Sequence, residues 1–147
     1  MASSDPQQPS DPSSSRENEP GAVTPAILQG IHDIASRYDN LKCHLCAQAI
    51  EEYLKQQNIH GKRIKLDVPY PRTKADNYIY DDSLPPESAV ISENGHHEGV
   101  TVNINREEIV FDNNHPNGIP YVEWKANLIF DSKIFFEKDF NESIKSW

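Results

Sequence analysis

Residues 41–68 read LKCHLCAQAIEEYLKQQNIHGKRIKLDV, and the spacing of the apolar side chains changes within this stretch. In the first part the apolar residues recur at helical spacing, and Gly61 is expected to end the helix. Beyond it, Ile64, Leu66 and Val68 alternate with polar residues, which is typical of a strand with one buried face. The stretch therefore predicts a helix followed directly by a strand.

The residues before this stretch predict another helix. Thr24 can cap its free amides, and Pro25 is tolerated at the first helical position. The apolar residues that share one face of this helix are Ile27, Leu28, Ile31, Ile34 and Tyr38. The second helix should begin after a cap at Asp39 or Asn40, and its apolar stripe is centred near Cys46.

Strands dominate the rest of the chain. A long connection rich in Pro and Asp covers residues 70–87, and strands are expected over residues 89–92, 98–104 and 109–112. The last two form a hairpin through a turn at residues 105–107. A short helix over 120–128 and an edge-like strand over 133–140 follow. Helices first and strands later indicate an α+β fold, with N-terminal helices packed on a small antiparallel sheet.

Composition divides the chain into two parts. Residues 1–23 are rich in Pro and Ser with few large apolar side chains, which predicts a disordered tail before a single domain over residues 24–147. A net charge of -9 argues against nucleic acid or anionic membrane as a partner. The chain shows neither an apolar stretch of about 20 residues nor a signal peptide, so we expect a soluble protein that is cytoplasmic as made.

The only two cysteines, Cys43 and Cys46, are too few to indicate a disulfide scaffold. If Asp39 or Asn40 caps the second helix, Cys43 lies in its first turn, where free amides and the helix dipole favour a thiolate. Cys43 is expected at the reachable edge of the apolar stripe and Cys46 inside it. The alternative is that both are small core residues.

Two further candidates follow the turn signal Asn94-Gly95. His96 and His97 enter the predicted strand, so that one of them can project into a cleft, although a solvent-facing loop histidine is the simpler interpretation. Antiparallel pairing in the hairpin brings His97 to within a few residues of Asp112. A thiol, a base and an orienting carboxylate together can carry out nucleophilic catalysis, whereas Asp112 viewed alone is ordinary turn chemistry.

These residues resemble the papain-fold toxin domains of bacterial polymorphic toxin systems, and the resemblance spans about residues 41–140. It rests on Trp124 and on four segments: CHLCA at 43–47, NIHGKRIKL at 58–66, ISENGHHEGV at 91–100 and VFDNNHPNGIP at 110–120. The resemblance implies a papain-like fold with a catalytic triad of Cys43, His97 and Asp112. It favours His97 over His96 because the histidine of the family directly precedes an acidic or aliphatic residue and then Gly, as in His97-Glu98-Gly99. It leaves Cys46 as the alternate nucleophile.

The resemblance also implies a toxin or effector that attacks a peptide or side-chain amide, as a cysteine protease or deamidase. Its expected partners are a protein substrate and an immunity protein, and export would not use a Sec signal peptide. No glutamine precedes the cysteines where papain places an oxyanion-hole side chain. That role is expected to fall to backbone amides near Cys43, or to Asn40.

Three other interpretations remain open from the sequence. A zinc site could use Cys43, Cys46, His96 and His97, but adjacent histidines on a strand point to opposite faces. A dithiol oxidoreductase would need a strand before the cysteine helix, where a helix is expected instead. A non-catalytic interaction module is the third. We expect no cofactor, since the sequence contains no phosphate-binding glycine loop and no dinucleotide-binding motif.

Overall fold

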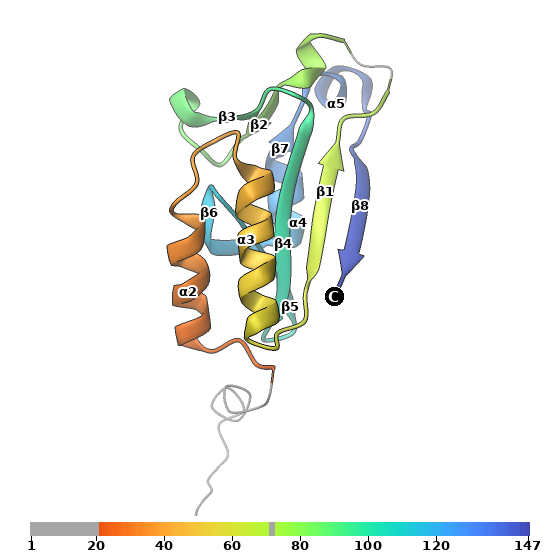
Figure 1. Cartoon of the computed structure of the whole chain (residues 1–147). Helices are drawn as coiled ribbons and strands as arrows, with labels where there is room; N and C mark the ends of the chain where they lie inside the picture. The colour runs from red at the N-terminus through yellow and green to blue at the C-terminus, as the bar shows by residue number, and fades with distance from the viewer. Residues whose placement is uncertain (1–20, 71–72) are drawn as a thin grey trace, which may run out of the picture.

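The described part of the chain, residues 21–70 and 73–147 of a computed structural model, begins with the two predicted helices (Figure 1). Helix α2 spans Pro25–Ala35, and the hydroxyl of Thr24 accepts a hydrogen bond from the amide of Ile27 at 3.2 Å. The predicted cap of the first helix is therefore confirmed. Most of the predicted tail, residues 1–20, lies outside the described residues.

Helix α3 spans Cys43–Gln56 and begins later than the sequence suggests. Its N-cap is Lys42, which makes no capping hydrogen bond through its side chain, so the predicted cap at Asp39 or Asn40 is wrong. Leu41 has a φ of 75°, which interrupts helical geometry directly before the helix. The side-chain amide of Asn40 instead donates hydrogen bonds to the backbone carbonyls of Ser88 and Val90.

The strands form two antiparallel sheets. The larger sheet has the order β6-β5-β4-β1-β8 and consists of β1 (Lys62–Asp67), β4 (His96–Ile104), β5 (Glu107–Asp112), β6 (His115–Pro120) and β8 (Asn141–Ser146). The smaller sheet has the order β3-β2-β7 and consists of β2 (Ile79–Asp81), β3 (Val90–Ser92) and β7 (Leu128–Ile129). The remaining helices are η2 (Ala75–Asn77), η3 (Pro86–Ser88), α4 (Tyr121–Asn127) and α5 (Asp131–Phe136).

The larger sheet lies between two layers. Helices α2 and α3 cover one face, and α4 lies on the other face (Figure 1). Residues buried on the helical side include Ile31, Ile50, Leu54, Val100 and Val102. Residues buried on the other side include Ile64, Leu66, Val110, Trp124 and Phe130. The α+β class, with N-terminal helices packed on an antiparallel sheet, is confirmed.

The predicted hairpin of β4 and β5 is confirmed, with a turn one residue shorter than the predicted one over residues 105–107. Ile104 pairs with Glu107, and the two turn residues, Asn105 and Arg106, both have positive φ, as in the tight turns that suit the twist of a hairpin. Val100 pairs with Phe111 at the other end. The hairpin therefore delivers the start of β4 and the end of β5 to the same edge of the molecule.

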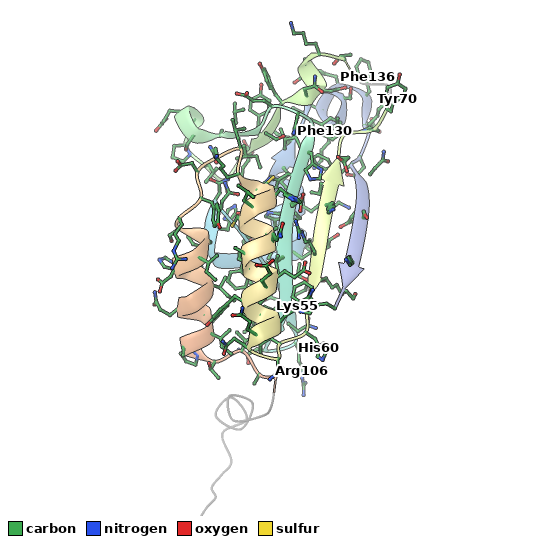
Figure 2. The ribbon with its side chains drawn as sticks, viewed as in Figure 1. Lys55, His60, Tyr70, Arg106, Phe130 and Phe136 are labelled. Atoms are coloured by element: carbon green, nitrogen blue, oxygen red, sulfur yellow. The ribbon has the colours of Figure 1, made fainter. Side chains whose placement is uncertain are left out.

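One expectation for the rest of the sheet is wrong. Residues 133–140 do not form an edge strand: α5 occupies their first half, and β8 pairs with β1 as the edge instead. The reason is that Phe130 and Phe140 anchor the segment by packing against each other in the core, with ring centroids 4.7 Å apart. Phe136 is left exposed, and Figure 2 shows it with Tyr70 at the end of the molecule near α5.

The long connection over residues 70–87 contains β2, which the sequence analysis missed because the strand is only three residues long. Strand β6 was missed as well. It contains Pro116 and Pro120, and proline argues against a strand except at an edge, where β6 lies. Among the described residues, no helix has the length and apolar character needed to cross a membrane.

Candidate active site

Cys43 is the first residue of α3. The first hydrogen bond of the helix runs from the amide of Cys46 to the carbonyl of Lys42, so the amides of the first turn have no partner within the helix. These amides and the helix dipole favour negative charge on the sulfur of Cys43. The thiol is more enclosed than predicted, because only 7% of the residue is exposed.

His97 and Asp112 form a buried pair behind Cys43. The Nε2 atom of His97 lies 2.9 Å from Oδ2 of Asp112, and their exposures are 0% and 1%. The Nδ1 atom is buried without a hydrogen-bond partner of regular geometry among the described residues, whereas the thiol of Cys43 interacts with the imidazole. The ring therefore binds the carboxylate through Nε2 and leaves Nδ1 available to the thiol.

Both carboxylate oxygens of Asp112 accept hydrogen bonds. The indole N–H of Trp124 donates to Oδ2 at 2.8 Å, and the backbone amide of Asn114 donates to Oδ1 at 2.9 Å. The ring of Trp124 also packs against that of His97, with centroids 5.8 Å apart. Burial alone would raise the pKa of Asp112, but the hydrogen bond and charge of His97, the charge of His115 and the hydrogen bond from Trp124 lower it, so the carboxylate stays ionised.

The electrostatics of the pair favour a thiolate on Cys43. Burial opposes ionisation, yet the interaction with His97, a backbone hydrogen bond from Glu98 and the charge of His96 together lower the pKa of the thiol. Burial likewise opposes protonation of His97, but Asp112 and Cys43 outweigh it and raise the pKa of the imidazole. A thiolate and an imidazolium are therefore the expected resting forms.

Cys46 lies one turn further along α3 in a different environment. It is completely buried, and burial together with the charges of Asp112 and Cys43 raises its pKa to about 12. The predicted stripe around it is partly wrong, since Leu45 is 51% exposed and Cys43 belongs to the buried face. This placement favours Cys43 over the alternate nucleophile.

A pocket of about 310 Å³ opens beside Cys43. Its lining combines apolar and polar side chains from around the start of α3, from the end of β3 and from the turn and strand that follow: Leu41, His44, Ile91, Ser92, Glu93, Asn94 and His96. Leu41 and Ile91 are apolar, and the other side chains can hydrogen-bond. The pocket therefore suits a substrate group that can hydrogen-bond, next to the thiol.

Three polar links join the segments around the site. The side chain of Asn113, in the turn after Asp112, donates a hydrogen bond to the carbonyl of Asp39 at 2.9 Å. The residue after Asp39 is Asn40, which donates to the carbonyls of Ser88 and Val90 as described above. On the other side, Nε2 of His115 lies 2.7 Å from Oδ2 of the buried Asp81. Since both amide donations of Asn40 go to these carbonyls, the amides of the first turn of α3 fit the oxyanion role better.

His96 and His97 diverge from each other, as their adjacent positions on a strand require. His96 binds Asp67 and Glu98, whereas His97 binds Asp112. In the described ranges, 21–70 and 73–147, no three His, Cys, Asp or Glu side chains converge as a metal-ligand cluster. The arrangement thus gives the proposed zinc set no common centre.

Sequence reasoning assigned no role to Trp124, Glu98 or His115, although all three are close to the site. The available signal was a charged residue, Glu98, at the start of the strand predicted over residues 98–104. Such a side chain needs partners on a neighbouring element when it is buried. The partners of Trp124 and His115 depend on how the sheets pack, which spacing along the chain does not show.

The helices on one face of an antiparallel sheet, with the cysteine at a helix start and the histidine and aspartate on paired strands, define a papain-like α+β fold. The chain belongs to the family described as papain fold toxin 2, whose model matches residues 26–129. No curated protein and no solved structure matches the chain.

Proposed function

We propose that this domain is the catalytic part of a toxin that hydrolyses amide bonds in cellular proteins through Cys43, His97 and Asp112. The observation that carries the proposal is the buried pair of His97 and Asp112, whose imidazole interacts with the thiol of Cys43 at the wall of a pocket. The family supplies the toxin context. The order of the roles follows from the hydrogen bonds.

In the first half of the reaction, the sulfur of Cys43 attacks the carbonyl carbon of the amide, and the thiol proton resides on Nδ1 of His97. Amides of the first turn of α3 are suited to stabilise the oxyanion, because they have no partner within the helix. His97 then gives its proton to the leaving nitrogen, the C–N bond breaks, and a thioester on Cys43 remains.

In the second half, water attacks the thioester carbon, and His97 takes a proton from that water. Collapse of the tetrahedral intermediate breaks the C–S bond, and the carboxylic acid product leaves. Asp112 keeps Nε2 of His97 protonated and the ring oriented throughout. Trp124 supports this role because it donates to the same carboxylate oxygen.

The bond attacked is either a backbone peptide, as in a protease, or a side-chain carboxamide, as in a deamidase. The mixed apolar and polar lining of the pocket is compatible with either bond. We propose further that the toxin reaches its target by a specialised route, with the predicted tail over residues 1–23 as a tether. An immunity protein would protect the producing cell.

Expression in bacterial cells tests the proposal. The wild-type domain should slow growth, and Cys43→Ala, His97→Ala and Asp112→Ala should abolish the effect at matched protein levels. Cys46→Ala is the matched control because it removes a thiol from the same helix and should remain toxic, as should the chain without residues 1–23. A harmless wild-type protein in every compartment, or equally toxic triad variants, would refute the proposal.

Intact mass spectrometry of candidate target proteins separates the two bond types. Fragments indicate proteolysis, and the small mass gain that accompanies conversion of an amide to an acid indicates deamidation. Cross-linked adducts would instead show acyl transfer to a second protein and would contradict hydrolysis.

A further inference from the structure

His96 lies in the wall of the same pocket as Cys43, but its side chain has no part in the mechanism above. Its Nδ1 atom is 2.9 Å from Oδ1 of Asp67, and its Nε2 atom is 2.6 Å from Oε2 of Glu98. Each ring nitrogen therefore faces a carboxylate oxygen. A second function for this histidine has to be consistent with both contacts.

The protonation state follows from these contacts. An ionised carboxylate can only accept hydrogen bonds, so both ring nitrogens of His96 must donate. A histidine with two N–H groups is an imidazolium and carries a full positive charge. The pKa of His96 leads to the same conclusion. The hydrogen bond to Glu98 raises this pKa, burial lowers it and the hydrogen bond to Asp67 raises it again, and the result is a pKa of about 9.

Glu98 is well suited to fix this charge. Its side chain is 1% exposed, and it accepts from Nε and Nη2 of Arg63 at 2.9 and 2.8 Å as well as from His96. The Nδ1 atom of His44, the neighbour of Cys43, lies 2.9 Å from the same oxygen that binds His96. These contacts lower the pKa of Glu98, in spite of its burial, so the carboxylate remains ionised.

The backbone of Glu98 connects this network to the nucleophile. Its amide donates a hydrogen bond to the sulfur of Cys43, while its side chain binds His96. Three consecutive residues of β4 thus act on one sulfur atom: His96 by charge, His97 as base and Glu98 through its amide. His96 cannot be a second base, because neither of its ring nitrogens is free to accept a proton.

We propose that His96 is a positioning residue of the active site, an imidazolium that Asp67 and Glu98 fix in the pocket wall to stabilise the thiolate of Cys43. The inference rests on the proposed function, since it concerns the same thiol. The charged and titratable groups around His96 are Asp67 and Arg63 from β1, Glu98 from β4, His44 and Cys43 from α3, and Glu93 from the turn before β4.

The sign of the pH effect follows from the raised pKa of His96. Its charge is present below about pH 9 and is lost as the pH rises through that value. Over the neutral range His96 therefore stays charged beside the thiolate of Cys43. Asp67 and Glu98 offset part of this charge, so we expect removal of the imidazolium to raise the pKa of Cys43 by about one pH unit, at the low end of the effect of a close charge.

The test measures alkylation of Cys43 by iodoacetamide as a function of pH in wild type, His96→Gln and His96→Lys. Glutamine can still hydrogen-bond to a carboxylate but has no charge, whereas lysine restores the charge without the ring. We expect the midpoint of the His96→Gln profile to rise by about one pH unit, with alkylation about tenfold slower below the midpoint. The His96→Lys profile should return toward wild type.

Two outcomes separate the failures. If Cys43 of the wild type reacts no faster than a free thiol, the proposed function itself fails. If Cys43 is activated and depends on His97, but His96→Gln leaves its midpoint unchanged in a folded protein, only the role of His96 is refuted. Nitrogen-15 NMR of the histidine rings gives an independent reading: one unprotonated ring nitrogen in His96 at neutral pH would overturn the inference without any reference to activity.

Discussion

The sharpest prediction concerns the two thiols of α3, which lie one turn apart and differ in environment. The perturbation is a limiting amount of iodoacetamide at mildly acidic to neutral pH. Only the thiolate reacts, so the rate at each cysteine follows its thiolate fraction. We expect modification almost entirely at Cys43.

The magnitude follows from the two pKa values. The pKa of Cys46 is raised from the ordinary 9.0 to about 12, and that of Cys43 is lowered below 9.0. For a thiol whose pKa lies above the pH, each further unit of pKa lowers the thiolate fraction tenfold. The thiolate fraction of Cys43 at neutral pH should therefore be at least about a thousandfold higher than that of Cys46. Complete burial of Cys46 further slows its reaction.

Peptide mass spectrometry of a time course measures both rates in one sample. His97→Ala is the informative variant, because loss of the imidazole should move the Cys43 profile to higher pH and leave Cys46 unreactive. The sign is that of an acid whose pKa is depressed: the thiolate is present above the folded pKa and is lost as the pH falls through it. Equal labelling of the two cysteines, or faster labelling of Cys46, would refute the reasoning.

Two predictions concern the packing that supports the site. Gly99→Ala would place a Cβ 2.8 Å from Val110 Cγ1 and 3.0 Å from Trp124 Cζ2. We therefore expect a loss of about 1–3 kcal/mol in the free energy of unfolding, measured by chemical denaturation. Unchanged stability would contradict this packing. Asn40→Ala removes the hydrogen bonds to Ser88 and Val90 and should cost about 1–2 kcal/mol, together with reduced selectivity of alkylation for Cys43; a variant as stable and selective as wild type would show that this link is dispensable.

The features predicted correctly from the sequence depend on neighbours along the chain. Thr24 and Pro25 begin α2 because a hydroxyl cap and a proline act within one turn. The turn predicted at residues 105–107 is a two-residue turn of Asn105 and Arg106, both with the positive φ that suits a tight hairpin turn, and Glu107 already belongs to β5. The predicted hairpin is what allowed His97 and Asp112 to be predicted within a few residues of each other.

The wrong predictions share a different physical cause. Asn40 is a good helix cap by residue type, but its amide binds two carbonyls on a segment almost fifty residues away, and the helix begins at Cys43 instead. Residues 133–140 have the composition of a strand, yet the packing of Phe130 against Phe140 leaves room for a helical turn between them. In both cases tertiary contacts outweighed local preference.

The sequence by itself indicated the two N-terminal helices, the hairpin of β4 and β5, and the candidate thiol, imidazole and carboxylate. Which cysteine faces the imidazole, and with what pKa, was decided only in the tertiary structure, because burial and neighbouring charges depend on packing between α3 and β4. The same is true of His96. Its two carboxylate partners come from β1 and β4, and only the folded sheet brings them to opposite nitrogens of one ring.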